Sequence, residues 1–264
     1  MAALFPYIVT YILGAITGSF LNVCIYRLPR GISIVKPRSA CPACSAQIKA
    51  RELIPLVSYL FLRGRCSSCG AKIPVRYPLV EFLCGALWIA AFWKFALSFQ
   101  FVFYALIISI LLAVFFIDLE WMRIPNKLVL SALIPAAALS VRYAFFLSAP
   151  ERFRSAYGGI DAAAPLLGLI PAAFFLLIYA VTSAFGKGRG SIGMGDIKLL
   201  IPAGLALGLR QCALAVFVAV MLGGATGVLL LATGRKTRKD PIPFGPFLTA
   251  GIIFAIFVPL SAIV

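Results

Sequence analysis

The stretch FQFVFYALIISILLAVFFI (Phe99–Ile117) decides the fold class, because it runs for 19 residues without a charged side chain. A helix of that length rises roughly 28 Å, which is close to the hydrocarbon thickness of a bilayer. Comparable apolar runs recur along the chain, and 62% of its 264 residues are hydrophobic. The sequence therefore predicts an all-α polytopic membrane protein and not a soluble domain.

Apolar segments divide the chain into three predicted parts. Residues 1–26 form a first transmembrane helix, residues 27–77 a polar module, and residues 78–264 a domain of seven further helices. We therefore expect about eight transmembrane helices, with the polar module between the first and the second. The eight apolar segments cover residues 5–26, 79–97, 99–117, 128–147, 163–185, 197–209, 212–232 and 243–263.

The sixth apolar segment is unusually short. It has about 13 residues, with Pro202 and Gly204 inside it, and a helix of that length rises only roughly 20 Å. One solution is that the preceding backbone, SIGMG (Ser191–Gly195), enters the membrane beside protein or a water-filled cavity. Such a placement would bring Asp196 to a cavity at the membrane boundary.

The charge distribution predicts an orientation in the membrane. The chain has 24 Lys and Arg against 8 Asp and Glu, a net charge of +16, and the 27–77 module holds ten of the basic residues and one acid, Glu52. With this module in the cytosol and the helices alternating, 19 basic residues fall on the cytosolic side and five elsewhere. Both termini then face outward. We expect the excess positive charge to interact with anionic membrane lipids, and we expect no nucleic-acid partner.

Four cysteines of the polar module have the spacing C-x2-C-x21-C-x2-C. Two such cysteine pairs can together form a tetrahedral site for a structural zinc ion. No His is present anywhere in the chain to serve as an alternative ligand. Two disulfides or a redox role are the alternatives, although a reducing cytosol disfavours disulfides. The predicted ligands are Cys41, Cys44, Cys66 and Cys69, whereas Cys24, Cys84 and Cys212 lie in apolar runs and should pack as small hydrophobic residues.

Two aspartates lie at the ends of apolar segments, where an ionisable group is costly and indicates function. Asp118 directly follows the opening stretch, and Asp196 stands in GSIGMGDIKLL (Gly190–Leu200). In the predicted topology both lie at the cytosolic boundary, so they could meet and share one proton. One carboxylate would then activate a water while the other polarises a peptide carbonyl, as in aspartic proteases.

The glycines next to Asp196 fit this hypothesis. Gly193 and Gly195 would let a substrate backbone approach and would permit unusual backbone angles. The alternative is that Asp196 only caps the sixth helix, which would explain Asp196 but not Asp118.

Seven stretches in a fixed order resemble one known family. They are GSFLNVCIYRLPRG (Gly18–Gly31), the CPAC and CSSC pairs, IPLVSYLFLRGRC (Ile54–Cys66), RYPLVEFL (Arg76–Leu83), IDLEWMRIPN (Ile117–Asn126), GMGDIKL (Gly193–Leu199) and PFGPFL (Pro243–Leu248). In these stretches the chain resembles the bacterial prepilin peptidases of type IV pili and type II secretion, which are bifunctional leader peptidases and N-methyltransferases. The resemblance covers nearly the whole chain.

This resemblance implies a complete function. Asp118 and Asp196 would be the catalytic pair, and the four module cysteines would bind zinc. The enzyme would stand in the bacterial inner membrane with both termini in the periplasm and its active site at the cytosolic face. It would cleave the basic leader from prepilins and pseudopilins after a glycine, and then methylate the new N-terminus with S-adenosylmethionine.

Two further acids are candidates for substrate contacts. We expect Glu120 to lie near the catalytic cavity and Glu81 at the membrane end of the cysteine module, where either could bind the basic leader or the ammonium group of the methyl donor. The alternative is a local ion pair with Arg76, Arg123 or Lys127.

Two other classes of function remain open on the sequence alone. An ion-coupled transporter could use Asp118 and Asp196 as a proton relay near a broken helix. A membrane scaffold could bind partners through the cysteine module, but it would leave both aspartates without a role. A prepilin peptide separates these hypotheses, because only a peptidase changes the mass of the peptide.

Overall fold

The computed structural model describes residues 4–147, 164–185, 193–237 and 240–258. Within these ranges the chain forms helices, turns and two isolated β-bridges, so the prediction of an all-helical protein is confirmed. The elements are α1 (Phe5–Arg27), η1 (Ala50–Leu53), α2 (Val57–Phe61), α3 (Arg76–Phe95), α4 (Phe99–Trp121), α5 (Asn126–Leu147), α7 (Ala164–Leu167), α8 (Ile170–Phe185), α9 (Met194–Ala232) and α10 (Gly245–Phe257).

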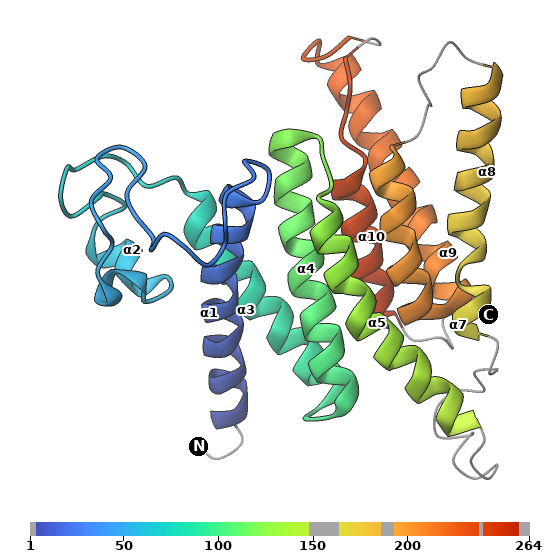
Figure 1. The fold of residues 1–264 in the computed structure, drawn as a ribbon, viewed down its shortest axis with the longest axis horizontal. Coiled ribbons are helices and arrows are strands. Elements are labelled where there is room, and N and C mark those ends of the chain that lie inside the picture. Colours follow the sequence, from blue (N-terminus) through green and yellow to red (C-terminus); the bar gives the residue numbers. More distant parts are fainter. Residues whose placement is uncertain (1–3, 148–163, 186–192, 238–239, 259–264) are drawn as a thin grey trace. The chain divides into compact units, whose positions relative to one another are not determined.

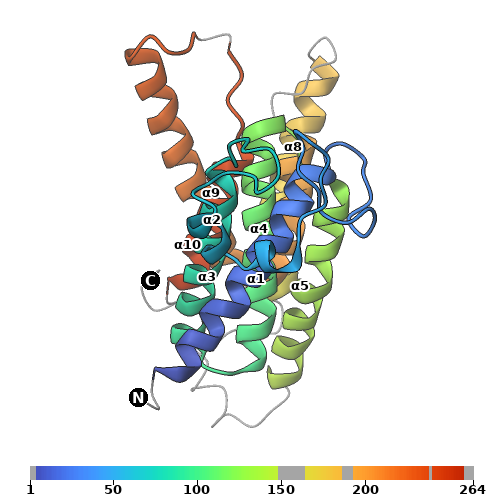
Figure 2. The ribbon, with the colours of Figure 1, turned by 90° about the vertical axis from the view of Figure 1, so that its left-hand side faces the viewer.

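The chain divides into two compact units, Met1–Ala113 and Val114–Val264. In the first unit α1 and α3 run side by side (Figures 1 and 2). Glycines permit their close approach: a methyl group added to Gly14 would lie 2.9 Å from the Cα atom of Gly85, and one added to Gly18 would lie 2.8 Å from that of Glu81. A small residue at every fourth position is a common way for membrane helices to pack closely.

The polar module of the first unit lies between α1 and α3 in the sequence and contains only the short helices η1 and α2. The buried Arg27 side chain at the end of α1 folds the first part of the module back, since it donates hydrogen bonds to the carbonyl oxygens of Ser33 and Pro37 at 2.9 and 2.8 Å. Turns and side-chain hydrogen bonds therefore hold the module more than regular secondary structure does.

In the second unit α9 packs against α5, α7, α8 and α10. The segment α9 is broken at Gly208, where φ is 75° and ψ is 177°, so it consists of two helices in sequence. This conformation is accessible to glycine at little cost. The break lies close to the predicted boundary between the sixth and seventh apolar segments, and the first helix begins at Met194, three residues before the predicted start.

Within the described residues, five helices are long and apolar enough to cross a membrane. They cover Phe5–Arg27, Arg76–Phe95, Phe99–Trp121, Pro165–Ala184 and Met194–Ala232. The protein is therefore a multi-pass membrane protein. The predicted loop 148–162, with Glu151 and Asp161, and most of the loop 186–196 lie outside the described residues.

Candidate functional site

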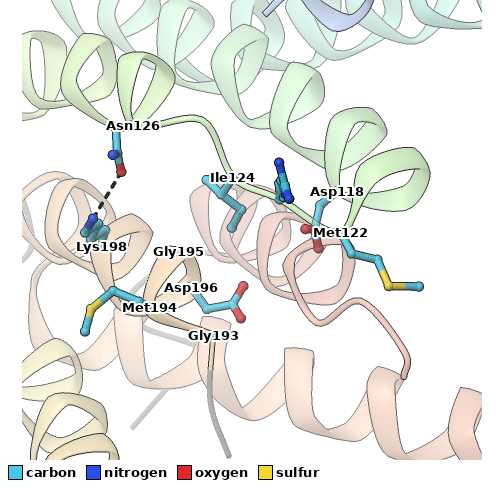
Figure 3. Close-up of a pocket in the computed structure, with 10 residues that line it drawn as sticks. Asp118, Met122, Ile124, Asn126, Gly193, Met194, Gly195, Asp196 and Lys198 are labelled. Carbon is cyan, nitrogen blue, oxygen red and sulfur yellow. Dashed lines mark hydrogen bonds between the residues drawn. The ribbon is translucent and has the colours of Figure 1, made fainter. Parts of the chain in front are cut away.

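A cavity of about 380 Å³ opens in the second unit where the end of α4 faces the beginning of α9 (Figure 3). Both aspartates singled out in the sequence lie in its wall, although they are 78 positions apart along the chain. Their carboxylates point into the same space (Figure 3). The lining residues are Asp118, Met122, Arg123, Ile124, Asn126, Gly193, Met194, Gly195, Asp196 and Lys198.

Asp118 stands in the last turn of α4 and is buried, with 6% of its surface exposed. Its Oδ2 atom accepts a hydrogen bond of 3.0 Å from the backbone N–H of Gly245, the first residue of α10. The preceding turn of α4 presents fully buried apolar side chains such as Val114 and Ile117. A carboxylate in such a place requires a partner, and the partner here comes from a segment that is distant in sequence.

Asp196 stands in the first turn of α9, where Gly193 is the N-cap in an extended conformation. The Asp196 N–H donates to the carbonyl oxygen of Gly193 at 3.1 Å, and a methyl group added to Gly193 would lie 2.7 Å from Asp196 Oδ2. The side chain thus folds back over its own N-cap residue, where the helix dipole favours a negative charge. The N-cap of α9 is Gly193 and not Asp196, and in the described residues no side-chain hydrogen bond caps this helix end. The alternative that Asp196 serves only as a cap is therefore not supported, whereas its position in the cavity wall is.

The two glycines of the GMGD stretch have different neighbours. Gly193 lies beside the Asp196 carboxylate, whereas a methyl group added to Gly195 would lie 3.0 Å from the Cβ atom of Ile124. Gly195 therefore lets the start of α9 approach the connection between α4 and α5. Both glycines line the cavity, as a role in substrate approach requires.

A polar pair on the cavity wall was not predicted from the sequence. Lys198 donates a hydrogen bond of 3.1 Å from Nζ to the side-chain oxygen of Asn126, which links the start of α9 to the start of α5 (Figure 3). The sequence contained a signal for Lys198, because it is a charged residue inside an apolar segment, two positions after Asp196. Gly245 was missed too, because nothing local in PFGPFL points to Asp118.

Glu120 and Glu81 lie in different surroundings. Glu120 is exposed in the last turn of α4 and is not among the described residues that line the cavity. Glu81 belongs to the first unit and is buried, with 8% of its surface exposed. Its Oε2 atom accepts a hydrogen bond of 2.8 Å from the backbone N–H of Leu56 in the polar module.

The bond from Leu56 to Glu81 holds an unusual turn. Leu56 has φ 61° and ψ −48°, and the N–H of Val57 donates to the carbonyl oxygen of Pro55 at 2.6 Å, which together make a γ-turn with positive φ. Turns of this kind are rare and strained. Glu81 therefore ties a strained turn of the module to α3.

The four predicted metal ligands form one cluster in the first unit. The sulfur atoms of Cys41, Cys44, Cys66 and Cys69 all lie within 4.8 Å of one another. Four thiolates around zinc at about 2.3 Å would be separated by about 3.8 Å, so the cluster has dimensions that suit such an ion. Neither these cysteines nor the buried Cys24, Cys84 and Cys212 form disulfides in the structure.

The two halves of the cluster have matching backbones. In the first, the N–H of Cys41 donates to Ala46 and its carbonyl oxygen accepts from Ser45. In the second, the N–H of Cys66 donates to Ala71 and its carbonyl oxygen accepts from Gly70. The residues at the equivalent fourth positions, Ser45 and Gly70, both have positive φ, 58° and 72°. The backbone N–H groups of Cys69 and Ser68 lower the pKa of Cys66 to about 7. The backbone N–H of Ala71 lowers the pKa of Cys69, but the Cys44 thiol, burial and its other cysteine neighbours raise it to about 11.

Comparisons with known proteins agree on one family. Residues 12–95 match the family described as the Bacterial Peptidase A24 N-terminal domain, and residues 105–228 match the Type IV leader peptidase family. No solved structure matches the chain.

Three similar proteins are each called prepilin leader peptidase/N-methyltransferase. The protein of Bacillus subtilis (strain 168) is 35% identical over 247 residues, which cover 94% of this chain and 92% of the relative. That of Myxococcus xanthus (strain DK1622) is 38% identical, with coverage of 90% and 69%, and that of Stutzerimonas stutzeri is 32% identical, with coverage of 90% and 85%.

Proposed function

Because the chain belongs to the peptidase A24 family and is a type IV prepilin leader peptidase with N-methyltransferase activity, we propose that Asp118 and Asp196 are its catalytic pair. The family confirms the function that the ordered motifs predicted. It also sets aside the transporter and scaffold hypotheses, which belong to other classes of protein.

One observation supports the assignment of Asp118 and Asp196 as the catalytic pair. Asp118 comes from the end of α4 and Asp196 from the start of α9, yet both line the same cavity. No other Asp or Glu is among its lining residues in the described part of the chain. A pair of facing carboxylates is the arrangement that aspartic proteases use to divide base and acid roles.

In the proposed reaction one carboxylate takes a proton from a water, and the water oxygen forms a bond to the carbonyl carbon of the scissile peptide. The other carboxyl group donates its proton to the carbonyl oxygen, which gives a neutral gem-diol. The C–N bond then breaks: the first carboxyl group gives its proton to the amine, and the second recovers a proton from the diol. The leader leaves with a new carboxyl group, and the pair returns to its starting state.

The pH dependence of cleavage tests this division of labour. One carboxyl group must be ionised and the other protonated, so kcat for a prepilin peptide should fall on both the acid and the alkaline side of its optimum. Methylation of a pre-cleaved pilin peptide, measured over the same pH range, serves as the control for folding. A cleavage rate that levels off on one side, while methylation shows that the enzyme is intact, would contradict the proposed pair.

We propose that Cys41, Cys44, Cys66 and Cys69 hold one structural zinc ion. The sulfur spacing and the two matching backbone turns support this assignment. Four thiolates leave no open coordination position, so the metal would stabilise the module and take no part in peptide hydrolysis.

S-adenosylmethionine is the proposed methyl donor, since the relatives are named N-methyltransferases. Glu120, exposed at the end of α4, remains a candidate for contact with the basic leader. For Glu81 we propose an anchoring role in place of ligand binding, because its carboxylate already accepts the Leu56 N–H and is buried.

We place the enzyme in the bacterial inner membrane, with the active site at the cytosolic face and both termini in the periplasm. The proposed eight spans are the five long apolar helices, with α9 counted as two at its Gly208 break, together with α5 and α10. The distribution of basic residues supports this orientation. The proposed substrates are prepilins and pseudopilins.

A further inference from the structure

The bond between Gly245 and Asp118 joins two residues that are 127 positions apart and both buried. Gly245 is the first residue of α10, so its N–H has no acceptor within its own helix. The N-cap residue, Phe244, has no side chain able to accept a hydrogen bond, and Pro246 has no N–H. Asp118 therefore supplies the acceptor for the N–H at the beginning of α10.

Gly245 also leaves space for the Asp118 carboxylate. A methyl group added to Gly245 would lie 2.6 Å from Oδ2 and 2.9 Å from Cγ of Asp118. Gly245 is in a helix and does not have a positive φ, so its backbone conformation does not require glycine. What requires glycine at this position is the contact with Asp118.

We propose that Gly245 is a positioning residue for peptide hydrolysis, whose N–H holds Oδ2 of Asp118 and leaves Oδ1 as the reacting oxygen. An N–H group can only donate, so Oδ2 accepts this bond and carries no proton toward Gly245. The proton that Asp118 takes up or gives away during the reaction is then carried by Oδ1, whichever of the two roles Asp118 has. This inference rests on the proposed catalytic role of Asp118 and goes beyond it.

Holding Oδ2 of Asp118 in place matters for the proposed reaction, because it sets the direction of the other oxygen. A carboxylate held at one oxygen cannot rotate freely, so the second oxygen keeps a constant direction toward the cavity. Asp196 has a different support, since its side chain folds over Gly193 at the start of its own helix. Each aspartate carboxylate thus lies against a glycine that leaves room for it, Gly193 at the start of the same helix for Asp196 and Gly245 of a distant helix for Asp118.

Gly245→Ala tests the proposal. The added methyl group should displace the Asp118 carboxylate and lower kcat for prepilin cleavage roughly tenfold to a hundredfold, with little change in KM. Methylation of a pre-cleaved pilin peptide by the same purified enzyme should stay at the wild-type rate. The matched control is Gly224→Ala in α9, where an added methyl group meets no atom within 4 Å, and both of its activities should be unchanged.

A second variant removes the hydrogen bond without adding atoms to the cavity. Replacing the amide between Phe244 and Gly245 by an ester removes the N–H donor, and it also weakens the Phe244 carbonyl oxygen, which accepts from the N–H groups of Phe247 and Leu248. It should lower kcat for cleavage by about tenfold, while methylation reports whether α10 is still folded. This variant decides the question if Gly245→Ala also loses methylation and is therefore misfolded. Wild-type cleavage by the ester enzyme, or by a Gly245→Ala enzyme that still methylates, would overturn the positioning role.

An Asp118→Asn enzyme, assayed in the same experiment, distinguishes an error in the catalytic pair from an error in the role of Gly245. Asn keeps an acceptor for the Gly245 N–H, so α10 remains capped while the carboxylate is lost. If Asp118→Asn cleaves at the wild-type rate, the catalytic pair itself is wrong. If Asp118→Asn is inactive and the Gly245 variants are fully active, only the role of Gly245 is wrong.

Discussion

At the scale of single residues, the start of α9 shows why a glycine can matter as much as the acid beside it. Gly193 is the N-cap of α9, and the Asp196 carboxylate lies over the place where its side chain would be. Gly195, two positions on, is in contact with Ile124 and serves helix packing. The GMGD stretch therefore combines a glycine that leaves room for the carboxylate with a glycine that lets its helix approach the connection between α4 and α5.

Gly193→Ala should impair cleavage far more than it lowers stability. The new methyl group would lie 2.7 Å from Asp196 Oδ2, so the carboxylate must rotate or shift within the cavity. We expect kcat for cleavage to fall roughly tenfold to a hundredfold, methylation of a pre-cleaved peptide to be unchanged, and the melting temperature to fall by a few degrees, because Ala is a poorer N-cap residue than Gly. Cleavage at the wild-type rate would show that the position of the Asp196 side chain is not critical.

At the scale of elements, a strained turn of the polar module is tied to α3 by a single acid. The γ-turn at Leu56 is strained, and its N–H is bound by Glu81 of α3. The sequence pointed to Glu81 as an acid near the end of an apolar segment, but not to its partner. A backbone N–H leaves no signature in a sequence, which is why an ion pair or a ligand was the expected partner.

Glu81→Ala should loosen the attachment of the module. It leaves the Leu56 N–H without its acceptor, at a cost of about 1–3 kcal/mol. We expect faster amide hydrogen exchange at residues 54–57 than in the wild-type enzyme. Glu81→Gln keeps an acceptor oxygen and should stay close to wild type. Equal exchange rates in Glu81→Ala and the wild-type enzyme would exclude an anchoring role.

The cysteine cluster allows a prediction about metal content. Purified enzyme should contain one zinc per chain, and each single Cys→Ser change among the four ligands should lower that content markedly, because the chain has no His to take the place of a lost thiolate. Cys212→Ser is the matched control, since Cys212 is buried in α9 and lies outside the cluster. Wild-type protein that elemental analysis finds free of metal would contradict the zinc assignment.

At the scale of the whole molecule, local patterns predicted the helical membrane fold, the four-cysteine cluster and two aspartates at helix ends. These features are visible in sequence because hydrophobic runs, paired cysteines and isolated acids are local signals. The contacts of Gly245 with Asp118, of Leu56 with Glu81 and of Lys198 with Asn126 were not predictable. Each joins segments that are distant in sequence through groups, such as a backbone N–H, that carry no distinctive pattern.

The proposed orientation can be tested with reporter fusions. A reporter enzyme that needs disulfides should be active in bacteria when fused after Val264 and inactive when inserted in the 27–77 module, because only the periplasm is oxidising. A cytosolic reporter at the same two positions should give the opposite result. Activity of the disulfide-dependent reporter inside the module would reverse the orientation and place the cavity on the periplasmic side.

The central claim is that the two aspartates of one cavity cleave the prepilin, and its most direct test is the single-turnover cleavage rate of Asp118→Asn and Asp196→Asn enzymes. Both changes keep the shape of the side chain and its capacity to accept hydrogen bonds. Each variant should cleave a prepilin peptide at least about a hundredfold more slowly than wild type, while methylating a pre-cleaved peptide normally. Cleavage near the wild-type rate by either variant would contradict the account.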